Sequence, residues 1–183
     1  MKAADRGREI RRKLAAATAE LIVELGWSAV STRLVAARAG VAASLVHYHF
    51  PSIDVLRREA AMGVLTELLD AARQQVEQAD TAEIGLSELL EVLDREDGAV
   101  SLLFVEAYLA ATRDDVLRVQ LSRLAADFRQ TLARLLDDNG IELPEPSAVV
   151  LAAALDGLML HRALDPTLSS QGVGTVLNRL LTC

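Results

Sequence analysis

The sequence has a single cysteine and few aromatic residues. Cys183 has no partner in the chain, so no internal disulfide forms and nothing requires an oxidising compartment. Aromatic residues make up only 3% of the chain, whereas Ala, Leu and Arg, which favour helices, are frequent. We find no signal-peptide pattern, and no apolar stretch of the ~18 residues that a membrane span needs. The sequence therefore predicts a cytoplasmic protein with no membrane partner.

The sequence also lacks motifs that would indicate catalysis or a bound metal. It contains no Gly-x-Ser-x-Gly, no HExxH and no glycine-rich loop for phosphate. Two of its three histidines, His47 and His49, lie two positions apart and would point about 200° away from each other on a helix. No Cys or carboxylate stands near them at ligand spacing. We expect a protein that is not an enzyme and has no cofactor or metal site.

Long runs of period-two alternation, which would indicate strands, are missing too, and helical spacing takes their place. An apolar stripe runs from Ile10 to Leu25, and Gly26 ends it. Ser31 and Ser52 are good N-cap residues for the helices that follow them. The sequence predicts an all-α fold of about nine helices, at roughly 10–25, 31–39, 43–49, 52–79, 82–95, 99–112, 114–138, 146–163 and 171–181.

Charge is distributed unevenly along the chain. Residues 1–58 carry a net charge of +5 and the remaining residues one of −12, which together give the −7 of the whole chain. A basic N-terminal region on an acidic chain indicates that only this region meets a polyanion, unless the arginines merely lie on a solvated helix face. The Arg-Arg-Lys run at 11–13 would add electrostatic attraction to a phosphate backbone without reading its sequence.

Two short helices in the basic region indicate a helix-turn-helix. Segments 31–39 and 43–49 are too short to be stable alone, so they must pack on the helices before and after them. The turn Ala39-Gly40-Val41 joins them, and the second helix of such a pair enters a major groove of DNA. We expect the apolar residues that flank the turn to face inward: Val35, Ala36, Val41 and Val46.

The sequence His47-Tyr48-His49-Phe50 places four rings at the end of the second short helix. We expect Phe50 to be a core residue that fixes this helix against its neighbours. Tyr48 and His47 would then lie on the opposite side, where they can reach base edges or phosphate oxygens. His49 either contacts DNA or supports the start of the next helix.

The same region resembles the TetR family of transcriptional regulators over about residues 8–60. The resemblance rests on Gly26-Trp27, Ser31, Val35-Ala36, Ala39-Gly40-Val41, Leu45-Val46-His47-Tyr48-His49-Phe50, and Ser52, Asp54 and Leu56. It implies a helix-turn-helix domain at 1–51 and a helical ligand-binding and dimerisation domain at 52–183. A looser resemblance to BetI-like members covers LFVEAYLAATRDD at 103–115 and ALDGLMLHRALDP at 154–166.

The resemblance implies a set of DNA-contacting residues, and the chain departs from the family pattern at some of them. Ala42, Leu45, His47 and Ile53 replace the usual Ser, Thr, Tyr and Lys, which removes several phosphate contacts. Arg38 is either a phosphate contact or a solvated charge, and so is Arg33. The implied DNA-binding residues are Ser31, Thr32, Arg33, Ala42, Ala43, Ser44, Leu45, His47, Tyr48 and His49.

The C-terminal region carries the residues for two further expectations. Segment 149–155 is apolar on every face, so it needs partners on all sides, either from a second copy of the chain or from within the monomer. We expect a homodimer interface at Val150, Ala154, Gly157, Leu158, Val173, Val176, Leu177 and Leu180. We expect a cavity for a small, largely apolar ligand at Met62, Phe104, Tyr108, Met159 and His161, unless these are ordinary core residues.

These patterns together predict a TetR-type regulator, a repressor that binds a palindromic operator in double-stranded DNA as a homodimer and is released by a small molecule. The alternative is a helical ligand-sensing or protein-docking module whose N-terminal region has lost DNA binding, as the four departures permit.

Overall fold

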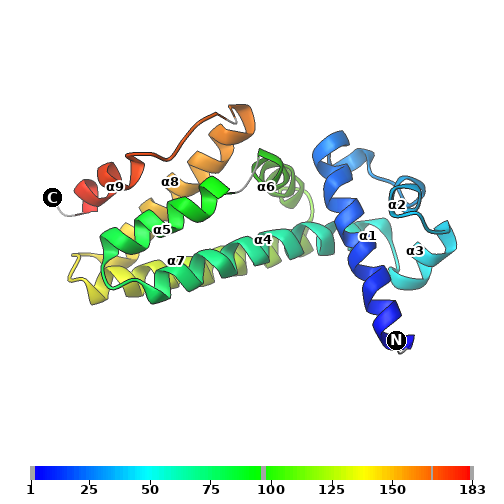
Figure 1. Cartoon of the computed structure of the whole chain (residues 1–183), viewed down its shortest axis with the longest axis horizontal. Helices are drawn as coiled ribbons and strands as arrows, with labels where there is room; N and C mark the ends of the chain where they lie inside the picture. The colour runs from blue at the N-terminus through cyan, green and yellow to red at the C-terminus, as the bar shows by residue number, and fades with distance from the viewer. Residues whose placement is uncertain (1–2, 96–97, 166, 182–183) are drawn as a thin grey trace.

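The computed structural model describes residues 3–95, 98–165 and 167–181. Regular secondary structure in these ranges consists of nine α-helices and one turn of 3-10 helix at Trp27–Ala29, which confirms the all-α prediction. The helices are α1 (Ala3–Leu25), α2 (Thr32–Ala39), α3 (Ala43–His49), α4 (Ile53–Gln78), α5 (Ala82–Arg95), α6 (Gly98–Ala111), α7 (Asp115–Asp138), α8 (Pro144–Leu164) and α9 (Val173–Leu181). Helices α1–α3 form a head at one end of the molecule, and α5–α9 form a body at the other (Figure 1).

Capping residues place the short helices of the head. The Oγ of Ser31 accepts a hydrogen bond from the backbone N–H of Leu34 at 3.4 Å, which starts α2. Gly40 ends α2 with φ of 67°, a left-handed conformation that glycine adopts without strain. Ser52 starts α4 in the same way as Ser31 starts α2, through the N–H of Val55 at 3.2 Å. The helix-turn-helix therefore forms where the sequence predicts it.

Two helix starts differ from the sequence prediction. We expected Pro144 and Pro146 to break the chain before a helix at 146, but α8 begins at Pro144 and contains both. Proline is tolerated in the first turn of a helix, because the N–H groups of that turn have no partner within the helix. Likewise, α6 begins at Gly98, which we had expected only to separate two helices.

Helix α8 also corrects the expectation that no stretch is long and apolar enough to cross a membrane. By length and composition it is one such candidate among the described residues. Its Ala148, Leu151 and Leu155 are buried in the core of the body, where α8 packs against α6 and α7. The apolar composition of α8 thus serves packing on at least one face.

Helix α4 joins two hydrophobic cores. Leu56, Ala61 and Leu65 lie in the core of the head with Leu14, Val46 and Phe50 of α1 and the α3 region. One and two turns further along the same helix, Leu68 and Ala72 lie in the core of the body. The domain boundary expected between residues 51 and 52 stays a prediction, but the packing of the head continues beyond it into α4.

The four rings that end α3 separate as the sequence predicts. Phe50 is only 1% exposed, and the guanidinium of Arg11 lies 4.3 Å from the centre of its ring. Tyr48 is 82% exposed and packs edge-on against His49. His49 is half-buried, and its backbone carbonyl accepts a hydrogen bond from Arg11. Phe50 therefore belongs to the core, while Tyr48 is available at the surface.

Replacing Phe50 with alanine should lower the free energy of unfolding by about 3–5 kcal/mol, because it leaves a cavity in the core of the head. Tyr48→Phe is the matched control, since it removes only an exposed hydroxyl and should leave the melting temperature nearly unchanged. Chemical denaturation of both variants measures the difference. A larger loss of stability for Tyr48→Phe than for Phe50→Ala would mean that the two faces of α3 are assigned the wrong way round.

Candidate nucleic-acid interface and ligand cavity

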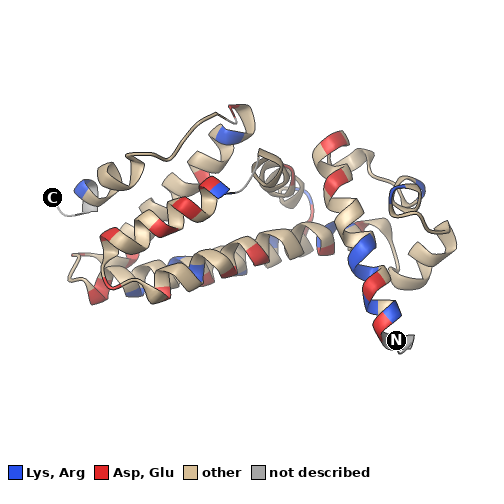
Figure 2. Cartoon of the chain, in the orientation of Figure 1, with Lys and Arg blue, Asp and Glu red and all other residues tan. Residues whose placement is uncertain are grey.

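The outer face of α3 is made of small and uncharged polar residues. Ala43, Ser44, His47 and Tyr48 are all exposed, and their spacing of four residues along the helix puts them on one side. Val46 lies on the opposite side and is buried. No Lys, Arg, Asp or Glu occurs on this helix (Figure 2). The face can thus approach another surface closely, because its side chains are short or stand on the exposed side of the helix.

The other residues expected to contact DNA lie around this face in different degrees of exposure. Ser31, Arg33 and Ala42 are exposed, whereas Thr32, Leu45 and His49 are half-buried. Ala42 precedes α3 and makes no side-chain capping bond, as the loss of the usual serine predicts. The structure does not test whether any of these residues contacts DNA.

Most basic residues of the head are engaged in ion pairs. Arg38 lies between Glu20 and Glu24 of α1, with its nitrogens 3.2 and 2.6 Å from their carboxylates. The hydrogen bond from Arg38 lowers the pKa of Glu24, and the two carboxylates raise the pKa of Arg38. Arg38 therefore forms ion pairs with α1. The sequence suggested a phosphate contact or a solvated charge, and neither of these includes such a pairing.

Arg11 and Arg12 of the basic run are paired as well, with Glu59 and Glu9. Lys13 and Arg33, in contrast, are exposed and have no ion pair within the described part of the chain. The net charge of the head therefore overstates the positive charge that is free to attract a polyanion.

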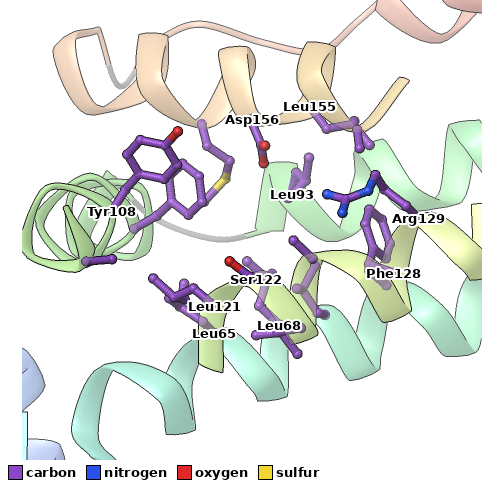
Figure 3. A pocket seen from close by; sticks show the side chains of 18 of the residues that line it. Leu65, Leu68, Leu93, Tyr108, Leu121, Ser122, Phe128, Arg129, Leu155 and Asp156 are labelled. Atoms are coloured by element: carbon purple, nitrogen blue, oxygen red, sulfur yellow. The ribbon is translucent and has the colours of Figure 1, made fainter. Parts of the chain in front are cut away.

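A cavity of about 450 Å³ lies in the body between α4, α5, α6, α7 and α8. Three of the residues expected to line it do so, namely Phe104 and Tyr108 from α6 and Met159 from α8. The rings of Phe104 and Tyr108 lie 6.2 Å apart at a tilt of 39° (Figure 3). The volume is in the ordinary range for a site that binds a small molecule.

The other two residues expected in the cavity do not line it. His161 follows Met159 by two positions, so it points to the opposite side of α8 and is exposed. Met62 lies on α4 nearly one turn before Leu65, the first residue of that helix to line the cavity. The prediction failed at His161 because two neighbours at this spacing lie on opposite sides of a helix, and at Met62 because the sequence does not say where along a helix a cavity begins.

Polar groups in the cavity were missed by the sequence prediction. Asp156 of α8 and Arg129 of α7 both line it, together with Ser122 (Figure 3). Burial raises the pKa of Asp156, and the nearby charge of Arg129 offsets this only in part. One signal was present in the sequence, because Asp156 is the only charged residue within segment 147–160.

The residues expected at a dimer interface fall into two groups. Val150 and Val176 are exposed, and a side chain added at Gly157 would meet only open space. Ala154 is half-buried on the same stripe of α8 as Val150 and Gly157.

The second group packs within the monomer. Leu158, Val173 and Leu177 pack against the core of the body, and α9 lies along α5. Leu180 belongs to α9, but its side chain lies outside the described residues. These contacts match the alternative of burial within one chain for this part of the predicted interface.

Fold and site together define a helix-turn-helix protein with a cavity in its helical body. Residues 14–60 match the family model for "Bacterial regulatory proteins, tetR family", and residues 77–182 match that for "Tetracyclin repressor-like, C-terminal domain". The chain therefore belongs to the TetR family of bacterial transcriptional regulators, as its N-terminal motifs predict.

Individual relatives agree with this assignment. The chain is similar to the HTH-type transcriptional regulator BetI 1 of Chromohalobacter salexigens, with 30% identity over 85% of this chain and 80% of the relative. A crystal structure of a transcriptional regulator from Rhodococcus sp. Rha1 superposes with a TM-score of 0.81 at 26% identity, covering 94% of each chain. A regulator from Saccharomonospora viridis, crystallised with choline, has the same fold, with a TM-score of 0.80 at 21% identity over 96% of each chain.

Asp156→Asn should stabilise the protein near neutral pH. A raised pKa means that the folded state binds the proton of Asp156 more tightly than the unfolded state, so stability falls as the pH rises through the interval between the two pKa values. The variant should gain free energy of unfolding at neutral pH, and the gain should disappear below about pH 4. Urea denaturation at both pH values measures it, with the exposed Asp138→Asn as control. An equal effect at both pH values would show that ionisation of Asp156 is not the cause.

Proposed function

We propose that the protein is a cytoplasmic transcriptional repressor that binds a palindromic operator as a homodimer and leaves it when a small molecule fills the cavity. The observation that carries the proposal is the exposed face of α3, which presents Ser44, His47 and Tyr48 on a helix held from behind by Phe50. A helix presented in this way can enter a major groove, where hydroxyl and imidazole groups bond to base edges or phosphates.

Different parts of the head would do different work on DNA. The exposed side chains of α3, Ser44, His47 and Tyr48, would read bases, directly or through water, because they stand clear of the surface. Ser31, Thr32 and Arg33 at the start of α2 would fix the register on the DNA backbone. The electrostatic attraction would come from Lys13 and Arg33. Together with Arg6, they are the exposed cations of the described part of the head that have no ion pair.

One observation favours the alternative, a helical ligand-sensing or docking module without DNA binding. Helix α3 carries no Lys or Arg, and Arg11, Arg12 and Arg38 are paired with carboxylates. Such a head would bind DNA weakly and with a small dependence on salt. Measuring affinity for operator DNA, selected from a pool of genomic fragments, distinguishes the two functions.

Operator affinity should fall as salt rises, because each cation that neutralises a phosphate releases counterions. Arg33→Ala should reduce the slope of log affinity against log salt by about one. Arg38→Ala, on the same helix, is the matched control and should leave the slope unchanged, since Glu20 and Glu24 already neutralise it. Fluorescence anisotropy at a series of salt concentrations measures the slope. A slope near zero for the unmodified protein would favour the docking module.

The outer face of α8 supports the proposed dimer. Val150, Gly157 and Leu164 lie on one side of the helix, with Val150 67% and Leu164 81% exposed. A strip this apolar on the surface of a regulator marks a surface for association. A symmetric pair of such helices would bring two heads to successive major grooves, as a palindromic site requires.

Val150→Glu should produce monomers, because two-fold symmetry would bury an unpaired carboxylate on each side of the interface at a cost of several kcal/mol. We choose Val150 over Leu177, since Leu177 packs against the core of its own chain and a charge there would disturb folding itself. Ile84→Glu, at an exposed position of α5, is the control and should leave the oligomeric state unchanged. Analytical ultracentrifugation reads the outcome, and intact dimers of Val150→Glu would place the interface elsewhere.

Helix α6 offers a route from the cavity to the head. Phe104 and Tyr108 line the cavity, and Glu106 between them accepts a hydrogen bond from the backbone N–H of Trp27 at 2.7 Å. Trp27 begins the 3-10 turn that follows α1, one of the helices of the head. A ligand that shifts α6 would therefore act on the orientation of the head, by as much as its affinities for the two arrangements differ.

Glu106→Ala should make the Trp27 amide exchange with solvent about tenfold faster, since one hydrogen bond to a charged group is lost. Glu106→Gln keeps an acceptor in place and should preserve most of the protection. Hydrogen exchange followed by NMR measures both variants. Unchanged exchange in Glu106→Ala would mean that the bond between Trp27 and Glu106 does not hold the head in solution.

A further inference from the structure

The carboxylate of Asp156 faces the cavity and has no close partner. It comes from the same side of α8 as Ala152 and Met159, which also line the cavity, at spacings of four and three residues. Within the described residues it makes no hydrogen bond and no ion pair. Asp156 is exposed to solvent as well as to the cavity, and the acceptor sites of its carboxylate are not taken up by any described residue. Asp156 can therefore accept a hydrogen bond or an ion pair from a ligand that enters the cavity.

The charged groups around Asp156 do not satisfy it. The positive charge of Arg129, on α7, lowers the pKa of Asp156, but the two side chains do not form an ion pair. Arg118, also on α7, is held by Asp115 at 2.7 Å. The lining residues of α4 and α5 are all apolar, and α6 contributes Tyr108 as its only titratable group. Burial accordingly raises the pKa of Asp156, which is the mark of a carboxylate without enough compensation.

Aromatic rings line the same cavity. Phe104 and Tyr108 form a tilted pair on α6, and Phe128 contributes a third ring from α7 (Figure 3). The face of such a ring attracts a cation, most strongly where water is excluded. One carboxylate and several rings around an apolar space are the groups that recognise a positive charge on an apolar body.

We propose that the cavity binds an organic cation with an apolar body, whose positive group pairs with Asp156 and whose remaining surface packs against the aromatic and leucine side chains. The proposal rests on the function proposed above in one respect, that the cavity is the ligand site. An organic anion fits less well, because it would pair with Arg129 only by approaching Asp156, and that would require Asp156 to be protonated.

The test uses three probes that share one apolar body and differ in charge, namely phenylbutylammonium, phenylbutanol and phenylbutanoate. Isothermal titration calorimetry of the intact protein without DNA measures their affinities. We expect the cation to bind about tenfold more tightly than the alcohol, because its charge pairs with Asp156 and interacts with the aromatic rings in addition to the apolar contacts. Its affinity should rise as the pH is raised through the pKa of Asp156, because only the ionised carboxylate attracts it and the ammonium keeps its proton throughout.

Two variants assign the effect to Asp156. Asp156→Asn keeps the shape of the side chain and should bring the affinity of the cation down to that of the alcohol, while leaving the alcohol unaffected. That unchanged alcohol affinity also shows that the variant is folded. Arg129→Gln removes the other charged group of the cavity lining that has no ion pair, and it should leave the binding of the cation equal or tighter.

Three results would overturn the proposal: tighter binding of phenylbutanoate than of phenylbutylammonium, equal binding of all three probes, or no binding of the cation at millimolar concentration. None of them would bear on the proposed repressor function, because operator binding and its salt dependence are measured separately. If the protein did not bind operator DNA but still preferred the cation, the proposed repressor function would be wrong. The protein would then be a module that senses cations without binding DNA.

Discussion

The rest of the structure depends on the continuity of α4, because one uninterrupted helix is a component of two hydrophobic cores. Leu56 and Leu65 are buried with α1 and α3, and Leu68 and Ala72 are buried with α5 and α7. A straight helix transmits rotation and tilt along its length, so the body cannot rearrange around α4 without changing what the head packs on. Arg58 strengthens this link where α4 meets the N-terminal end of α7, through its ion pair with Asp114 at 2.7 Å.

The cavity is built from the helices that also support the head. Helix α4 forms one wall, and α6, which contacts α1, forms another. Glu106 lies in the sequence between Phe104 and Tyr108, which line the cavity, and it accepts a hydrogen bond from the backbone N–H of Trp27. Under the proposed function, a ligand in this space would compete with the packing that holds α6 in place, so binding and head orientation would share the same contacts. That arrangement is what a two-state regulator requires, since a ligand shifts the equilibrium only through contacts that differ between the states.

Helix α8 shows how one helix serves two purposes. Asp156 and Met159 face the cavity, whereas Val150, Gly157 and His161 lie on the outer side. Periodicity of 3.6 residues separates the two sides, and it is the reason that His161 is not beside Met159. From the sequence we inferred that segment 149–155 of α8 is apolar on every face. We wrongly placed His161 in the cavity, and we did not predict that Asp156 lines it. Apolar residues on both sides leave no polar stripe to orient the helix, so the two faces cannot be told apart before packing is known.

The features that arise from neighbouring residues could be predicted from the sequence alone. Helix spacing, the Ser31 and Ser52 caps and the opposite directions of Tyr48 and Phe50 are local, because backbone geometry relates residues a few positions apart. Which charged residues form ion pairs, and where the cavity lies, became known only from the packing of the helices. Arg11 pairs with Glu59 from 48 residues away, Arg38 is neutralised by α1, and Asp156 faces Arg129 across a space enclosed by five helices. Such contacts depend on how whole helices pack, and no local spacing in the chain encodes the distance between them.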